Sequence, residues 1–477
     1  MVRVLLAAIE RQGDSPWLHT TRGTVSYSLA WRRIAGLSEW LQHTVGVPRG
    51  GVVATTLSEP EWLVYLIWAG MVARSTVAFL PERCGPDHLE DLLREISAVA
   101  VIHHPQQPCS ASGAIPFPAD DLGRWSMEVQ PGASGLAQDV SESGSGLLLQ
   151  TSGTLGEAKW VRVSEWQIAR AIRAMEDAGM LGHVANQVVY LSLPLSHSYG
   201  QSVLFESTFV QGAVVLPENP TLIGHLAALQ HESLSQSITA LEGVPFFHLQ
   251  LARLAPRLRL PRLRHLGVGG GKLDIVVFER LSETLKPLSV SVRYGLTETP
   301  SVVSRKVLLS LQADDWTSSG RPLDIYKVRI ENREGGECAT NEVGEIRVRG
   351  PCVCLPYCGW QETAGASLAT GDLGYLDDGG ELHITGRKSL FADRWGFRVS
   401  LEYIEDALRR HPDVLDCRVV EEQTRLCAEL VLRHRQALST QVRQFGATVL
   451  PWYALPDMYT CVNSIDRTQS GKIRRIH

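Results

Sequence analysis

Residues 150–161 (QTSGTLGEAKWV) bring hydroxyl side chains, glycines and a lysine together in one short stretch. Hydroxyl groups and the close backbone N–H groups of such a loop suit the oxygens of a polyphosphate, and a lysine adds positive charge. The stretch is not a Walker A loop, because Lys159 follows Gly156 by three positions and no Ser or Thr comes directly after it. Taken alone, it is also compatible with an ordinary turn. The predicted phosphate contacts are Thr151, Ser152, Gly153, Thr154, Gly156 and Lys159.

Six further clusters of glycine and polar residues follow along the chain. They occupy residues 194–200, 269–271, 294–299, 370–374, 386–388 and 468–472. Each cluster has an ordinary structural explanation when it is considered alone. Asp372 would be a turn residue, Glu298 an acid at the start of a helix, and Lys472 part of a solvated basic tail. The order of the clusters is more informative than any one of them.

In this order, the clusters resemble the motifs of the adenylate-forming superfamily, which includes acyl-CoA synthetases, peptide-synthetase adenylation domains and firefly luciferase. The resemblance covers nearly the whole chain, from residues 23–27 to Lys472. It implies that a carboxylic acid attacks the α-phosphate of ATP, that pyrophosphate leaves, and that an acyl-adenylate forms. Phosphoryl chemistry of this kind depends on positioning and on neutralising charge, here with Mg²⁺ and a cation.

The resemblance also implies a role for individual residues. The loop at 151–159 would hold the pyrophosphate half of ATP, Thr297 would contact the α-phosphate, and Glu298 would bind Mg²⁺. Lys472 would bridge the acid and the phosphate in the transition state. Tyr294 would lie on the adenine, and Asp372, beside Arg387, would accept the ribose hydroxyls; Gly270 and Gly271 complete the implied nucleotide site.

The implied acid pocket lies around residues 197–202. Amino-acid-activating relatives usually have an Asp directly after the aromatic residue of this motif, because a buried ammonium without a partner is costly. Ser198 occupies that position here, and the run His197, Ser198, Tyr199 is similar to acyl- and aryl-acid-activating members. Ser202 lies one helical turn beyond Ser198 and is expected to face the same pocket, as is Gly269. His197 is either part of this pocket and of catalysis or a purely structural histidine.

Three residues of the second half depart from what the family usually has: Ser389, Asp393 and Asp466 stand where Asp, Lys and Pro are common. They are expected to affect domain rotation or the second half-reaction. The charged residues needed for adenylation are all present, so we expect that step to proceed.

The composition of the 477-residue chain is that of an ordinary globular protein, with 44% hydrophobic and 20% charged residues. Its net charge of -5 gives no general attraction to nucleic acids or anionic lipids. The longest apolar run, residues 62–73, is too short to span a bilayer. Nine cysteines without a regular spacing favour a reducing compartment. These features predict a cytoplasmic protein with no membrane span and no nucleic-acid partner.

Strands alternate with helices over much of the first 385 residues, which predicts an α/β fold of layered sheets. Helices are expected at 27–41 and 60–71, and strands at 52–56, 77–80, 98–102, 188–193 and 213–216. Residues 105–146 are predicted to be mainly a connection, and a β-rich subdomain follows residue 320. The resulting domains are an N-terminal adenylation domain at 1–387 and a small, mobile α+β domain at 388–477 that contains the catalytic lysine.

The predicted function is ATP-dependent activation of an aryl or acyl acid, followed by transfer to a thiol. The acceptor is either the phosphopantetheine of a separate acyl or peptidyl carrier protein, which is marginally preferred, or coenzyme A. No fused carrier is expected, because the sequence ends at His477. The alternatives are a stand-alone enzyme that activates amino acids, a luciferase-like oxidation of the adenylate, and a non-catalytic nucleotide-binding relative.

Overall fold

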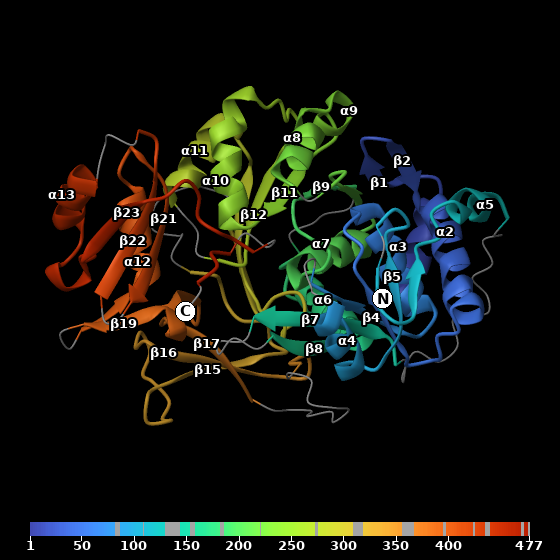
Figure 1. Cartoon of the computed structure of the whole chain (residues 1–477), viewed down its shortest axis with the longest axis horizontal. Helices are drawn as coiled ribbons and strands as arrows, with labels where there is room; N and C mark the ends of the chain where they lie inside the picture. Colours follow the sequence, from blue (N-terminus) through green and yellow to red (C-terminus); the bar gives the residue numbers. More distant parts are fainter. Residues whose placement is uncertain are drawn as a thin grey trace.

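The computed structural model describes residues 1–81, 86–107, 109–128, 144–152, 158–181, 186–219, 221–271, 275–308, 318–354, 367–394, 397–422, 425–434, 439–468 and 472–475. Strands and helices alternate as far as β14, and two largely β-stranded units follow (Figure 1). The predicted fold class is therefore confirmed. Among the described residues, no helix is both long and apolar enough to cross a membrane.

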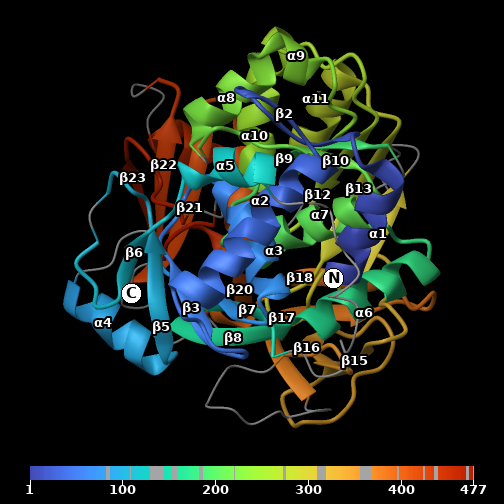
Figure 2. The same cartoon turned by 90° about the vertical axis from the view of Figure 1, so that its right-hand side faces the viewer.

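The first sheet has six strands in the order β6-β5-β3-β4-β7-β8. Its parallel strands are short, and the two at its centre, β3 and β4, are fully buried, as is usual for a sheet covered on both faces. The nearly all-apolar helix α3 (Pro60–Val72) packs against β4 and β7. The strands are β3 (Val52–Thr55), β4 (Thr76–Phe79), β5 (Ala98–His103), β6 (Ala114–Pro116), β7 (Gly146–Ser152) and β8 (Ala158–Ser164), and the last two form an antiparallel hairpin. Figure 2 shows this sheet beside α2 (Tyr27–Glu39), α3 and α4 (Pro86–Glu95).

The second sheet has eight strands in the order β14-β13-β12-β11-β9-β10-β1-β2. Its five central strands, β13 to β10 in this order, are parallel. Helix α7 (Ser198–Phe209) is buried along most of its length between this sheet and α1 (Val2–Gln12) and α6 (Glu165–Asp177). The strands are β1 (Pro16–Thr20), β2 (Gly23–Ser26), β9 (Val188–Leu191), β10 (Ala213–Val215), β11 (Ala240–Gly243), β12 (His265–Val268), β13 (Ser289–Tyr294) and β14 (Ser304–Leu308). The other helices here are α8 (Leu222–Gln230), α9 (Glu232–Ser235), α10 (Pro245–Leu254) and α11 (Ile275–Leu285).

A four-stranded antiparallel sheet follows, in the order β15-β16-β17-β18. Its strands are β15 (Lys327–Glu331), β16 (Gly344–Arg349), β17 (Ser367–Leu376) and β18 (Leu382–Arg387). Buried and exposed positions alternate along β16, as expected for a sheet with one face on a core. This is the predicted β-rich subdomain.

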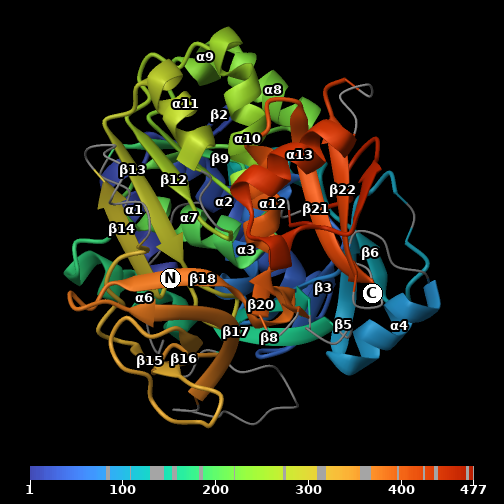
Figure 3. The same cartoon turned by 90° about the vertical axis from the view of Figure 1, so that its left-hand side faces the viewer.

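The C-terminal segment has a hydrophobic core of its own, which includes Ile404, Leu408, Val419 and Leu426. Its elements are β19 (Phe391–Arg394), β20 (Phe397–Ser400), α12 (Leu401–Arg409), β21 (Val414–Glu422), β22 (Arg425–Leu432), α13 (Ser439–Val449) and β23 (Met458–Cys461). Figures 1 and 3 show this segment, in orange and red, beside α10 and α11. A separate core is consistent with a separate domain, while the boundary at 387/388 remains a prediction.

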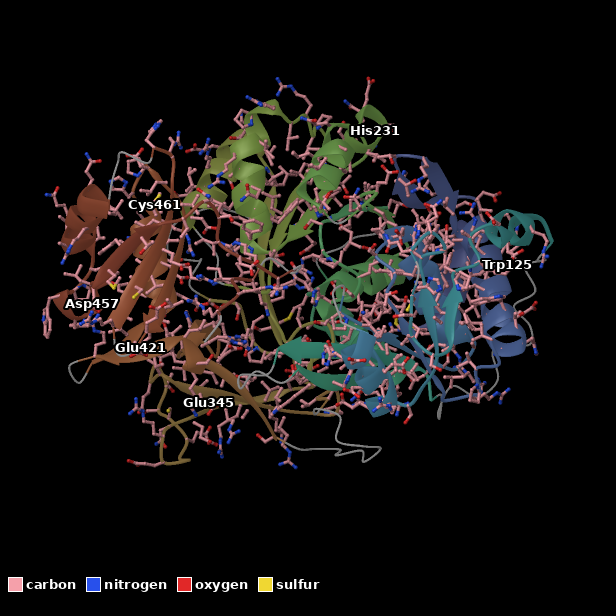
Figure 4. The ribbon with its side chains drawn as sticks, in the orientation of Figure 1. Trp125, His231, Glu345, Glu421, Asp457 and Cys461 are labelled. Atoms are coloured by element: carbon pink, nitrogen blue, oxygen red, sulfur yellow. The ribbon has the colours of Figure 1, made fainter. Side chains whose placement is uncertain are left out.

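One expected connection contains regular structure. Within residues 105–146, the structure has the strand β6 and the helix α5 (Asp121–Glu128). Both elements are too short to give a clear periodic pattern in the sequence. Tertiary packing therefore determines that these residues form a strand and a helix. Trp125 of α5, labelled in Figure 4, packs on α2 so closely that a Cβ at Gly36 would lie 2.4 Å from its Cγ.

Candidate active site

Asp372 lies at the centre of a buried hydrogen-bond cluster. It is paired in register with Arg387 across β17 and β18, and the Nε of Arg387 donates to its Oδ1 at 2.7 Å. The hydroxyl of Tyr294, at the end of β13, donates to its Oδ2 at 2.9 Å. Burial lowers the pKa of Arg387, but the charge and hydrogen bond of Asp372, together with the electrostatic effects of Tyr294 and Glu402, outweigh this effect and raise the pKa overall. Since a carboxylate has about four acceptor positions, the one at Asp372 keeps capacity for two more donors.

Glu298 lies in the turn after β13, and the backbone of that turn is fixed. Its carbonyl oxygen accepts from the backbone N–H of Cys354 at 2.7 Å, and Thr299 Oγ1 accepts from the backbone N–H of Leu296 at 2.9 Å. Burial raises the pKa of the Glu298 carboxyl, and the charges of Arg387 and Lys472 partly oppose that rise. A partly buried carboxylate of this kind is suited to a divalent cation, which would offset the cost of burial.

Lys472 comes from the C-terminal segment and lies within electrostatic range of these groups. Two hydrogen bonds fix its backbone to Thr468: the Lys472 carbonyl accepts from the N–H of Thr468 at 2.8 Å, and the Lys472 N–H donates to Thr468 Oγ1 at 3.1 Å. Lys472 as a whole is exposed, but the surrounding protein desolvates its ammonium, which together with the charge of Arg387 lowers its pKa, while Asp372 and Glu298 oppose that shift. The structure therefore brings the last predicted catalytic residue to the nucleotide-side cluster.

The predicted acid-pocket residues surround the start of α7. His197 is the residue before the helix, and burial together with the charge of Lys472 lowers its pKa to about 4. Its imidazole is therefore neutral near pH 7. Ser198 Oγ lies 3.4 Å from Thr297 Oγ1. These contacts place the start of α7 beside the turn that contains Glu298.

Arg293 is a residue of this region that the sequence reasoning missed. Successive side chains of a strand point to opposite faces, so Tyr294 faces Asp372 while Arg293 faces α7. Its guanidinium lies 4.8 Å from the ring centre of Tyr199, and its Nη2 donates to Ser202 Oγ at 3.0 Å. The available signal was its position directly before the tyrosine of a strand that ends at the site.

Glycines allow this close packing. A Cβ at Gly269 would lie 2.6 Å from Cγ of Arg293 and 2.9 Å from Cε1 of Tyr199. Gly270 has a φ of +73°, a conformation that other residues rarely adopt. Gly271 approaches Pro245, since a Cβ there would lie 3.1 Å from its Cγ. Gly269 is thus next to Tyr199, as the pocket prediction requires.

The predicted phosphate loop joins β7 to β8. Thr151 and Lys159 are paired across this hairpin, and the hydroxyl of Thr151 is 3.4 Å from the carbonyl oxygen of Lys159. Lys159 is exposed. The side chain of Ser152 and all of Gly153, Thr154 and Gly156 lie outside the described residues, so their predicted role stays a prediction.

Comparison with protein families identifies the class of protein. Residues 5–358 match the AMP-binding enzyme family, and residues 403–472 match the AMP-binding enzyme C-terminal domain. The chain belongs to the AMP-binding enzyme family, as the order of its motifs predicted.

Individual relatives are CoA ligases. The chain is 30% identical to 2-succinylbenzoate–CoA ligase of Bacillus velezensis over 340 residues, which are 69% of this chain and 67% of that protein. It is 25% identical to oxalate–CoA ligase of Arabidopsis thaliana over 464 residues, 90% and 88% of the two chains. Among solved structures, o-succinylbenzoate CoA synthetase of Bacillus subtilis in complex with an acyl-adenylate intermediate has a TM-score of 0.81 at 22% identity, covering 98% of this chain and 96% of that one.

Proposed function

We propose that this chain is an AMP-forming acid–thiol ligase, which converts a carboxylic acid and ATP into an acyl-adenylate and pyrophosphate and then transfers the acyl group to a thiol. The main support is the convergence of Lys472, Glu298 and Asp372, which lie in three separate sequence clusters, around one site. Membership of the AMP-binding enzyme family and the similarity to CoA ligases support the same reaction class.

The residues around Asp372 fit a nucleoside. Asp372 is oriented by Tyr294 and Arg387 and retains acceptor capacity, which suits the two hydroxyls of a ribose. The partly buried carboxylate of Glu298 fits Mg²⁺, a cation that proteins often hold through one or two carboxylates together with substrate phosphates. When bound, Mg²⁺ supplies neutralisation of phosphate charge. Thr297, next to Glu298, is the proposed contact to the α-phosphate.

In the proposed first half-reaction, a carboxylate oxygen of the acid attacks the α-phosphorus of ATP, and the bond to the bridging oxygen of pyrophosphate breaks. Lys472, protonated, would stabilise the negative charge shared by the acid and the α-phosphate in the transition state. His197 is neutral, so it adds no second positive charge near Lys472 and is available to orient the acid by hydrogen bonding.

The acceptor in the second half-reaction is a thiol, whose sulfur forms the thioester as AMP leaves. The relatives named as CoA ligases favour coenzyme A. A separate carrier protein, the marginal preference from the sequence, remains the second candidate. Supplying purified protein with acyl-adenylate and either coenzyme A or a phosphopantetheinylated carrier, and measuring thioester by mass spectrometry, decides between them.

Exchange of labelled pyrophosphate into ATP tests the function itself. We expect exchange that depends on Mg²⁺ and on an added aryl or acyl acid without an α-amino group, because Ser198 offers no carboxylate to an ammonium. A full panel of such acids without exchange would contradict this proposal. Strong exchange with proteinogenic amino acids alone would favour the amino-acid-activating alternative.

The pH dependence of adenylation should reflect Lys472. Its pKa is lowered, so its ammonium is lost at a pH below its ordinary value of 10.5, and the rate should fall as the pH rises through the lowered pKa. His197 protonates only near pH 4 and should produce no change between pH 5 and 8. The measurement is kcat/KM for exchange against pH. Lys472→Arg, whose guanidinium stays protonated, should remove the alkaline fall even if its rate is lower.

A contact between the two domains should favour the first half-reaction. Nη2 of Arg467 donates hydrogen bonds to both carboxylate oxygens of Asp416, at 2.8 and 2.7 Å. The Arg467 guanidinium also lies 4.3 Å from the ring centre of Phe246 in α10. Nearby, Arg253 Nη2 donates to the carbonyl of Leu415 at 2.6 Å. Since a cation–π contact contributes about 0.5–2 kcal/mol, Phe246→Ala should slow pyrophosphate exchange about 2- to 30-fold.

Thioester formation from supplied acyl-adenylate should be unchanged in Phe246→Ala, if the contact serves only the arrangement seen here. Phe246→Tyr retains the aromatic face and is the matched control, with exchange close to the unmodified rate. Equal loss of both half-reactions in Phe246→Ala would show that the contact supports folding and not one domain arrangement.

A further inference from the structure

A network of buried charges adjoins the predicted acid pocket. It consists of Glu206 on α7, Glu242 on β11, Arg293 on β13 and Arg305 on β14, whose side chains are at most 3% exposed. The three strands belong to the β14-β13-β12-β11 end of the eight-stranded sheet, and Glu206 reaches them from α7. Four ionised side chains without solvent are costly unless each is paired, so their arrangement decides what else the region can bind.

Each arginine of the network faces both glutamates. Arg293 Nη2 donates to Glu206 Oε1 at 2.5 Å, and its Nη1 lies 3.9 Å from Glu242 Oε2. Arg305 donates from Nη1 to Glu206 Oε2 at 3.4 Å and from Nη2 to Glu242 Oε1 at 3.1 Å. Two positive and two negative charges therefore balance among these four described side chains.

Two further polar groups border the network. Nε2 of His265 lies 3.3 Å from Nη2 of Arg305 and 3.0 Å from Ser291 Oγ, and its Nδ1 faces Ser289 Oγ at 2.8 Å. The hydroxyl of Tyr199 donates to Glu242 Oε2 at 2.7 Å, and burial and the proximity of this carboxylate raise its pKa, so Tyr199 is neutral.

Two buried donors of the network make no hydrogen bond within the described part of the chain: Nε of Arg305 and Nη1 of Arg293. The guanidinium of Arg293 lies over the ring of Tyr199 and donates from Nη2 to Ser202, two residues of the predicted acid pocket. A buried donor without an acceptor is costly, and a substrate oxygen would remove that cost.

We propose that Nη1 of Arg293 donates a hydrogen bond to a neutral oxygen of the acid substrate, a hydroxyl or a carbonyl, located about one helical turn from the reacting carboxylate. This proposal rests on the proposed function and specifies its substrate class. The spacing follows from α7: Ser198 meets Thr297 at the reacting end, and Ser202 meets Arg293 one turn, about 5.4 Å, further along. That span suits an oxygen across an aromatic ring from the carboxylate.

The charge balance argues for a neutral oxygen over a second carboxylate. An added anion would leave the network with one uncompensated negative charge, held close to the carboxylates of Glu206 and Glu242. A buried charge of this kind is strongly unfavourable. A hydroxyl or carbonyl takes the hydrogen bond without changing the charge.

The test measures pyrophosphate exchange with benzoate, 3- and 4-hydroxybenzoate, 4-acetylbenzoate and terephthalate. We expect kcat/KM for the best hydroxy or acetyl acid to exceed that for benzoate by about 10- to 100-fold, as a hydrogen bond to a charged donor allows. Terephthalate should be no better than benzoate. Equal use of benzoate and the oxygen-bearing acids, or a preference for terephthalate, overturns this proposal while leaving the ligase activity established. Absence of exchange with every acid contradicts the proposed function as well.

Variants then separate recognition from folding. Arg293→Met should reduce the ratio of kcat/KM between the preferred acid and benzoate to near one, and Arg293→Lys should retain part of it. Arg305→Met, the matched control, removes one charge from the same network without removing a contact to Tyr199 or Ser202. It should keep the ratio even if it lowers the melting temperature. An equal loss of the ratio in Arg293→Met and Arg305→Met would overturn the role of Arg293, and the wild-type panel remains decisive if Arg293→Met does not fold.

Discussion

Replacing Lys472 with alanine should lower the rate of acyl-adenylate formation by about 100-fold or more, while the affinity for ATP changes little. The reason is the position of its ammonium between the groups of both halves of the site: Glu298 and Asp372 on the nucleotide side and His197 on the acid side all interact electrostatically with it. Its charge would be most useful when the negative charge of the acid meets that of the α-phosphate. Pyrophosphate exchange and equilibrium binding of ATP measure the two quantities.

The control for Lys472→Ala is the second half-reaction. Thioester formation from supplied acyl-adenylate and a thiol should survive, because no new charge is formed on the α-phosphate before AMP leaves. Arg474→Ala removes a neighbouring exposed cation that hydrogen-bonds through its backbone, and it should adenylate at the unmodified rate. Normal exchange by Lys472→Ala would contradict the role proposed for this lysine.

The fold and the nucleotide side of the site were largely predictable from the sequence. Short apolar strands such as β3 and β4 are buried on both faces, and their residues indicate that directly. Arg387 follows Asp372 by 15 residues and Lys472 lies much further along the chain, yet each lies in a short cluster, and the order of these clusters is characteristic of one family. The structure brings the three together. The prediction that these residues share one site depended on the family resemblance. Composition and periodicity say nothing about contacts between residues that are 100 positions apart.

The polar lining of the acid side was not predictable in the same way. Glu206 and Arg305 lie in segments that are otherwise typical of a buried helix and a strand, with no cluster to mark them. A charged residue in such a segment is normally expected at the surface. Only the packing of α7 against β11, β13 and β14 reveals that their charges compensate one another. Sequence reasoning predicted Ser202 and Tyr199 as pocket residues but did not single out the arginine that contacts both.

Asp372→Asn should lower kcat/KM for ATP by about 100-fold, with most of the change in KM. The carboxylate now accepts from both Arg387 and Tyr294, and the proposed ribose contacts use its remaining acceptor positions. An asparagine has a single acceptor oxygen, so it cannot serve all these donors, and hydrogen bonds to a charged group contribute about 1.5–3 kcal/mol each. Initial rates of exchange at varied ATP give the comparison, with a melting curve to confirm that the variant is folded.

The same substitution should also move the alkaline fall in rate to lower pH. Asp372 is one of the groups that raise the pKa of Lys472, whereas Arg387 lowers it, so removing the carboxylate leaves the two cations facing each other with less compensation. Tyr294→Phe is the matched control: it removes one neutral donor to Asp372 and keeps the charge, so its alkaline fall should coincide with that of the unmodified protein. If Asp372→Asn changes neither the KM for ATP nor the position of that fall, Asp372 serves the fold alone, and the nucleotide must be held elsewhere.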